Sequence, residues 1–86
     1  MARFELRIKR SAAKEIARLP VADVRRVLQR LRALQDDPRP PGAVRLTGRE
    51  TWRVRQGDYR ILYDILDHVL IVEIIQVGHR REVYRG

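Results

Sequence analysis

Apolar and charged positions alternate at the start of the chain, where Phe4, Leu6 and Ile8 are separated by single charged residues. A period of two is typical of a half-buried β-strand. Ser11 then predicts the N-cap of a short helix that continues through Arg18. The first twenty residues therefore predict a strand followed directly by a helix.

After Pro20, which ends the first helix, the apolar spacing changes to three and four residues, the pattern of an amphipathic helix. The apolar stripe of this second helix consists of Val24, Val27, Leu28, Leu31 and Leu34. Its other face carries four arginines, Arg25, Arg26, Arg30 and Arg32. The proline-rich residues 36–42 end the helix and predict a stiff, extended connection.

The second half of the chain predicts β-strands throughout, over residues 44–46, 51–56, 59–66 and 69–77. Gly57-Asp58 has glycine in the first central position of a type II′ hairpin turn, and Asp67-His68 marks a second hairpin. We summarise the order as β-α-α-β-β-β, a single α+β domain over residues 1–86. In this fold, two N-terminal helices pack on one face of a mainly antiparallel twisted sheet, and the other face is left free.

A two-residue turn at Gly57-Asp58 fixes which side chains share a face of the predicted hairpin. Trp52, Val54, Ile61 and Tyr63 fall together on one face, as expected of a core. Arg53, Arg55 and Arg60 fall together on the other face. A slip of one residue would bury these arginines and expose Trp52, which is physically unfavourable.

Arg55 lies directly opposite Arg60 in this register, with Cβ atoms about 5 Å apart. Two guanidinium groups at that spacing repel each other, and folding does not require the pair, so we infer an anion between them. The second hairpin, counted in the same way, places Glu73 opposite Leu62 and diagonal to Arg60. Alternatively, the three arginines form a solvated face on which flexible side chains splay apart.

The segment after the last strand is rich in polar side chains. Gly78 lets the chain turn out of the sheet, so that the following side chains are able to fold back over the arginines. They include His79, Arg80, Arg81, Glu82 and Tyr84. His79 is the candidate acid or base, because imidazole titrates near neutral pH. Alternatively, His79 is a surface residue, Tyr84 packs against the fold, and the basic end is a solvated tail.

Charge indicates the kind of partner. The net charge is +8, the pI is about 11.2, and all but two of the 19 basic residues are arginine. Arginine grips phosphate bidentately and stacks on bases, so a polyanion, above all RNA, is the expected partner. The helix arginines are a separate candidate surface for RNA phosphates or an acidic segment of a protein partner.

The composition also excludes several kinds of site. The chain has no cysteine, which excludes disulfides, thiolate metal sites and cysteine nucleophiles. It contains no apolar run of about 20 residues, and its N-terminus does not resemble a signal peptide. We expect a soluble cytoplasmic protein without a metal or other cofactor.

Five motifs together resemble the RelE/ParE toxin superfamily, and its RelE branch in particular, over essentially the whole chain. They are Leu34-Gln35-Asp36-Asp37-Pro38, Arg45-Leu46-Thr47-Gly48, Trp52-Arg53-Val54-Arg55, Gly57-Asp58-Tyr59-Arg60-Ile61-Leu62-Tyr63, and Val77-Gly78-His79-Arg80 followed by Val83-Tyr84. The resemblance implies ribosome-dependent cleavage of mRNA in the A site. It also implies neutralisation by a cognate RelB-like antitoxin that wraps the toxin.

The resemblance assigns the family's functional positions to Arg53, Arg55, Arg60, Arg80 and Tyr84. Together with the residue-based reasoning, it gives one set of expected site residues. We expect Arg60, Arg80, Tyr84 and His79 to be catalytic, and Arg53, Arg55, Arg81 and Glu82 to bind substrate. The family usually has lysine where this chain has Arg53 and Arg55, and arginine cannot release a proton in a protein. The alternatives are a ParE-like gyrase poison without nuclease activity and a plain basic RNA-binding domain.

Overall fold

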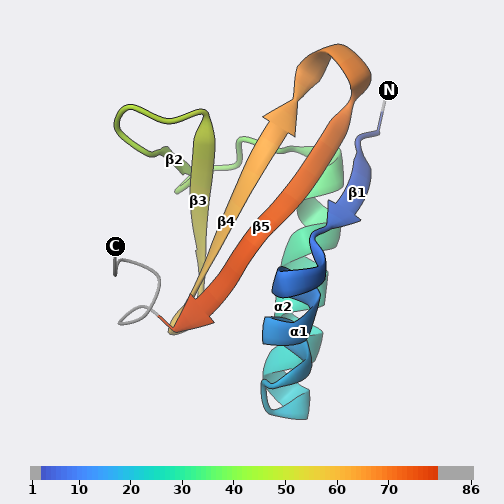
Figure 1. The fold of residues 1–86 in the computed structure, drawn as a ribbon, viewed down its shortest axis with the longest axis vertical. Coiled ribbons are helices and arrows are strands. Elements are labelled where there is room, and N and C mark those ends of the chain that lie inside the picture. Colours follow the sequence, from blue (N-terminus) through green and yellow to red (C-terminus); the bar gives the residue numbers. More distant parts are fainter. Residues whose placement is uncertain (1–2, 80–86) are drawn as a thin grey trace.

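The computed structural model describes residues 3–79 (Figure 1). Its elements are β1 (Glu5–Ile8), α1 (Arg10–Ala17), α2 (Val21–Asp36), β2 (Val44–Arg45), β3 (Thr51–Gln56), β4 (Tyr59–Leu66), the 3-10 turn η1 (Asp67–Val69) and β5 (Ile71–His79). The strands form one sheet in the order β1-β5-β4-β3-β2, in which β1 is parallel to β5 and all other neighbours are antiparallel. The predicted α+β fold is confirmed, and β2 adds one strand to the summarised order.

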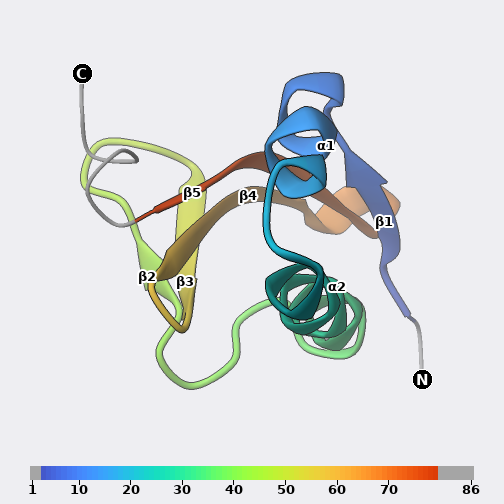
Figure 2. The same ribbon diagram turned by 90° about the horizontal axis from the view of Figure 1, so that it is seen from below.

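The helices pack on one face of this mixed sheet, α1 against β5 and α2 against β1 and β3. Figure 2 shows both helices near the β1 end and the β2–β3 edge at the other end. Within residues 3–79, neither helix covers the opposite sheet face. No helix in this part of the chain is long and apolar enough to cross a membrane.

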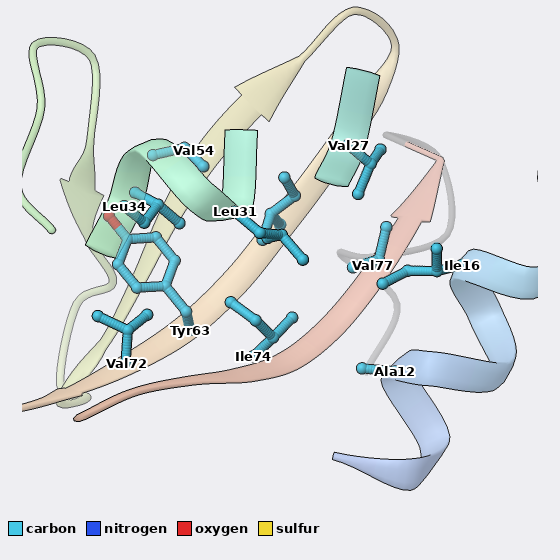
Figure 3. Packing of buried hydrophobic residues seen from close by; sticks show 11 residues of the cluster. Ala12, Ile16, Val27, Leu31, Leu34, Val54, Tyr63, Val72, Ile74 and Val77 are labelled. Carbon is cyan, nitrogen blue, oxygen red and sulfur yellow. The ribbon is translucent and has the colours of Figure 1, made fainter. Parts of the chain in front are cut away.

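The core lies between α2 and the centre of the sheet (Figure 3). Val27, Leu31 and Leu34 are fully buried, and Val24 and Leu28 are partly buried beside them, which confirms the predicted apolar stripe. The sheet contributes Val54, Ile61, Tyr63, Val72, Ile74 and Val77. Burial of each large apolar side chain contributes about 1.5–3 kcal/mol, so this layer holds the helices to the strands.

The β3–β4 hairpin has the predicted register. Arg55 pairs with Arg60, and Trp52 pairs with Tyr63. Gly57 has a φ of +60°, a left-handed conformation that glycine adopts without steric cost. The turn that this glycine allows therefore sets the faces of both strands.

The start of α1 differs from the prediction that Ser11 is its N-cap. Helix α1 begins at Arg10, and its N-cap residue, two residues before Ser11, is Lys9, which makes no side-chain cap hydrogen bond. The Lys9 backbone N–H donates to the Ile74 carbonyl at 3.0 Å, and the Lys9 carbonyl accepts from Ala13 N–H at 2.9 Å. Because the backbone of Lys9 bonds to both the sheet and the helix, the chain passes from one to the other without a side-chain cap.

The second hairpin is longer than predicted, so the two-residue turn at Asp67-His68 is wrong. Strand β4 ends at Leu66, which pairs with Ile71. The four residues between them form η1 and then Leu70, which has a φ of +54°. A left-handed leucine is uncommon, and the sequence carries no glycine or asparagine there to signal this turn.

A register shift between Leu62 and Tyr63 further changes the β4–β5 pairing. The longer turn by itself places Glu73 opposite Asp64, not opposite Leu62 as predicted, and the irregularity acts only on the pairs beyond Tyr63. Gln76 takes the position beside Leu62. The predicted carboxylate diagonal to the arginines is therefore replaced by a neutral amide.

Tyr63 joins the core to the segment after α2. Its side chain is fully buried, and its hydroxyl donates a hydrogen bond of 2.7 Å to the Pro38 carbonyl. Burial is the main cause that raises the pKa of Tyr63 to about 12. The neutral phenol is therefore the form that the folded state favours.

The substitution Tyr63→Phe tests this description through pH. At pH 8 it should cost about 1 kcal/mol, because the Pro38 carbonyl loses its donor. An unfolded tyrosine ionises near pH 10 and the folded one near pH 12, so the wild-type stability present below pH 10 is lost as pH rises between these values. Urea unfolding should show the wild-type advantage shrinking or reversing at pH 11. A difference that is equal at both pH values would contradict the burial argument.

Candidate nucleic-acid interface

Three arginines share the sheet face that points away from the helices, and we call the surface formed by Arg53, Arg55 and Arg60 the arginine face. Arg53 and Arg55 alternate along β3 with the core residue Val54, and Arg55 and Arg60 are direct cross-strand partners. Arg55 is exposed, whereas Arg53 and Arg60 are half-buried and their Nε atoms are shielded from solvent. Reduced solvent screening strengthens the attraction of such cations for an anion.

The floor of the arginine face is apolar and close-packed. Leu62, which pairs with Arg53, lies on the same face and is only 5% exposed. On the other neighbouring strand, Arg60 pairs with Gly78. Because glycine has no side chain, β5 adds no bulk beside Arg60.

Carboxylates lie further along the same face. Asp64 and Glu73 pair with each other across β4 and β5, and Asp64 accepts a hydrogen bond of 2.8 Å from the Thr51 hydroxyl. Within residues 3–79, Arg55 forms no ion pair with a carboxylate. The sheet face is thus divided into a basic end at the β3–β4 turn and an acidic pair nearer the other end.

His79 lies on the helix side of the sheet, so the expectation that it folds back over the arginine face is wrong. It pairs with Tyr59, and the two rings are in a T-shaped contact with centroids 6.2 Å apart. The Tyr59 hydroxyl donates to the Asp23 carboxylate of α2 at 2.9 Å, which places both rings beside the helix. Strand β5 continues in register through Gly78, so strand alternation, and not a turn, decides where His79 points.

The other predicted C-terminal site residues, Arg80, Arg81, Glu82 and Tyr84, lie outside the described residues. The structure therefore brings Arg53, Arg55 and Arg60 together and places His79 on the opposite face. Within residues 3–79, no cluster of three or more histidine, aspartate or glutamate side chains is arranged to hold a metal ion.

The sequence did not indicate a cleft beside the β3–β4 turn on the helix side, which has a volume of about 310 Å³. Its lining residues are Asp23, Arg26, Gln56, Gly57, Asp58, Tyr59 and His79. The hydrogen bond to Asp23 is the main cause that raises the pKa of Tyr59. Tyr59 and Asp23 are 36 positions apart, so local patterning could not reveal their contact.

A second cleft of about 480 Å³ shares the Tyr59 and His79 wall and continues along α1. On its border, the Glu15 carboxylate accepts a hydrogen bond of 3.0 Å from the Val77 backbone N–H. Glu15 and Asp23 therefore both connect the helices to the sheet near the basic end. The sequence does not indicate that Glu15 and Asp23 bind the sheet, because both appear only as polar positions of a predicted helix.

The helix arginines are less uniform than predicted. Arg25 and Arg32 are exposed, and Arg26 forms an ion pair of 3.2 Å with Asp23. Arg30 does not belong to the outer face, because it is half-buried and its Nε is shielded from solvent. The reason is its position on the helix, one turn from the buried Val27 and Leu34 and close enough to influence the Tyr63 hydroxyl.

Arg39, in the segment after α2, contacts both the β4–β5 turn and strand β3. It forms a bidentate ion pair with Asp67, with contacts of 3.2 and 2.8 Å, and its guanidinium lies 5.4 Å from the centroid of the Trp52 ring. The hydrogen bonds raise the pKa of Arg39 and lower that of Asp67. Arg39 is therefore paired with groups of the protein itself, whereas Arg55 forms no ion pair with a carboxylate within residues 3–79.

The described arrangement of elements is found in known toxins. The chain is 27% identical to a chain of the RelBE2 toxin–antitoxin complex of Mycobacterium tuberculosis, with a TM-score of 0.79 and coverage of 91% of this chain and 99% of that one. It is 26% identical to a chain of the archaeal RelE–RelB complex of Pyrococcus horikoshii, with a TM-score of 0.79 and coverage of 96% and 100%. Over 80 residues it is 25% identical to an Escherichia coli protein described as a RelE-like toxin, covering 91% of this chain and 84% of that protein.

The family model supports the same conclusion. Residues 6–84 match the model of the ParE toxin of the type II toxin–antitoxin system parDE. The match spans both helices and all of the strands from Leu6 onward, and the structural matches extend over the same elements. The chain therefore belongs to the RelE/ParE superfamily and is a toxin of a type II toxin–antitoxin system.

Proposed function

We propose that this toxin is a ribosome-dependent endoribonuclease that cleaves mRNA and so blocks translation. The observation that carries the proposal is the direct pairing of Arg55 with Arg60 on the sheet face away from the helices. Like charges directly opposite each other destabilise a strand pair, and a bound phosphate turns that cost into a favourable interaction. The likeness to RelE chains adds support from outside the site.

The proposed reaction is transesterification within the RNA. The 2′-oxygen loses its proton and bonds to the adjacent phosphorus, the bond from phosphorus to the 5′-oxygen breaks, and that oxygen takes up a proton. The products are a 2′,3′-cyclic phosphate and a 5′-hydroxyl. Negative charge builds on the non-bridging phosphate oxygens during the reaction, and we assign Arg60 and Arg80 to stabilise it.

The remaining predicted residues bind and position the substrate in this proposal. Arg53 and Arg55 hold the flanking backbone, and Arg81 and Glu82 extend the contact. Tyr84 stacks on a base or relays a proton. The described arginine face supplies no group that readily accepts a proton, because guanidinium does not titrate near neutral pH. The rate then depends on positioning of the 2′-hydroxyl, which is consistent with a requirement for the ribosome.

A RelB-like antitoxin is the proposed partner that neutralises the toxin. Two of the similar structures are complexes of RelE with RelB, from a bacterium and an archaeon. The net charge of +8 favours an antitoxin segment that is acidic where it meets the arginine face. Because mRNA and ribosomes are found in the cytoplasm, we expect the toxin to act there.

Arg60→Ala should reduce cleavage of translated mRNA on the order of 10²–10³-fold, because one stabilising donor at the phosphate is lost. Arg49→Ala is the matched control, since Arg49 is an exposed arginine outside the arginine face. Cleavage rates on programmed ribosomes provide the measurement. Equal rates for the wild type and Arg60→Ala would show that Arg60 takes no part in the reaction.

His79→Gln should reduce the cleavage rate less than about tenfold, whereas loss of a general acid or base costs about 10²-fold or more. The expected result follows from the position of the His79 ring, which contacts Tyr59 on the side of the sheet opposite Arg60. The pH dependence of kcat should also keep its shape. A larger loss together with a changed pH dependence of kcat would instead support the catalytic role predicted for His79.

A ParE-like gyrase poison is the second candidate, because the matching family model is that of the ParE toxin. The RNase proposal predicts mRNA fragments with 2′,3′-cyclic phosphate ends and no DNA breaks after induction of the toxin. Mapping of RNA ends and detection of gyrase-bound DNA breaks in the same cells distinguish the two functions. Gyrase-dependent DNA breaks with intact mRNA would favour the poison, and linear 3′-phosphates formed without a cyclic precursor would refute attack by the 2′-hydroxyl.

A further inference from the structure

The cleft of about 310 Å³ on the helix side, which we call the turn cleft, has no role in the reaction proposed above. It lies beside Gly57 and Asp58 at the tip of the β3–β4 hairpin. Its volume is at the lower end of the range of small-molecule sites, about 300–1,000 Å³. The turn cleft is therefore large enough for one flat ring system.

The groups that line the turn cleft are those that recognise a nucleobase. Tyr59 supplies an aromatic ring whose orientation is fixed at its hydroxyl by Asp23 and at its side by His79. Gln56 supplies an amide that both donates and accepts hydrogen bonds, and Arg26 supplies a guanidinium. Aromatic stacking combined with hydrogen bonds to base edges is how proteins read unpaired RNA.

The turn cleft and the arginine face lie on the two sides of the same hairpin tip. A smaller hollow of about 50 Å³ is lined by Arg55 and Arg60 on one side and by the turn on the other. It shares Gly57, Asp58 and Tyr59 with the turn cleft. Within residues 3–79, only the hairpin tip lies between a phosphate at the two arginines and the turn cleft.

We propose that the turn cleft binds the base of the nucleotide next to the phosphate held at Arg55 and Arg60. Tyr59 is the stacking platform, and Gln56 and Arg26 contact the edge of the base. This subsite rests on the proposed action on RNA. It makes the hairpin tip a determinant of which sequence is cut, in addition to the face on which cutting takes place.

Binding of short RNA that cannot be cleaved tests the proposal without any dependence on catalysis. The probes are 2′-O-methyl trinucleotides, one intact and three that each lack a single base. Removal of one of the three bases should weaken binding to the wild-type toxin about 5- to 100-fold, the effect of one stacked base. The two remaining abasic probes should show smaller losses.

Two substitutions separate stacking from a structural role of Tyr59. Tyr59→Phe keeps the ring and loses the hydrogen bond to Asp23, so it should retain the effect of base removal. Tyr59→Leu should abolish this effect while it retains affinity for the abasic probe. If Phe and Leu lose the effect equally, Tyr59 serves only to hold the hairpin against α2, and the proposal is overturned.

Gln56→Ala provides a variant with an intact aromatic wall, and Gln29→Ala on the exposed face of α2 is its control. Gln56→Ala should reduce differences in affinity among trinucleotides that differ only at the sensitive base, and Gln29→Ala should preserve them. A wild-type affinity that is insensitive to every base removal would refute the subsite. That result leaves the RNase proposal standing, whereas base-dependent binding without any mRNA cleavage would refute the RNase proposal alone.

Discussion

The two-residue turn at Gly57-Asp58 decides the chemistry of the sheet, because it fixes the register of β3 on β4. In this register Val54, Ile61 and Tyr63 face the helix layer, and the three arginines face away from it together with Leu62. A slip of one residue would exchange the faces and bury guanidinium groups in the core, which costs several kcal/mol for each ion. The energy of the core therefore holds Arg55 and Arg60 together in spite of their repulsion.

The helices form part of the core, and they also fix the position of the hairpin tip. Asp23 holds Tyr59, the residue before Arg60, and Glu15 holds the backbone of Val77 near the end of β5. Both contacts join acidic side chains of the helix layer to the end of the sheet where the basic groups lie. A hairpin tip that was free to move would leave its guanidinium groups poorly aligned, and electrostatic stabilisation depends on alignment before the reaction.

Much of the fold follows from local patterns, whereas the pairing of β4 with β5 does not. The apolar stripe of α2 and the glycine turn before Tyr59 are strong signals, since periodicity and turn chemistry act over a few residues. The longer β4–β5 connection depends on Leu70 in a left-handed conformation, for which leucine has no preference. This longer turn sets the pairing of Glu73, and the register shift near Leu62, which has no sequence signal either, sets that of Gln76, so neither pairing could be predicted.

A small domain has little stability to spare, since a chain of this length buries only about 60–65% of its unfolded surface. A pair of repelling arginines is therefore a measurable cost to this fold. Any anion that binds only the folded state stabilises it in proportion to the logarithm of its concentration relative to Kd. A substrate phosphate and an acidic antitoxin segment would both relieve the repulsion between Arg55 and Arg60. In the proposed function, competition for this one basic surface would link the stability of the toxin to its activity and to its inhibition.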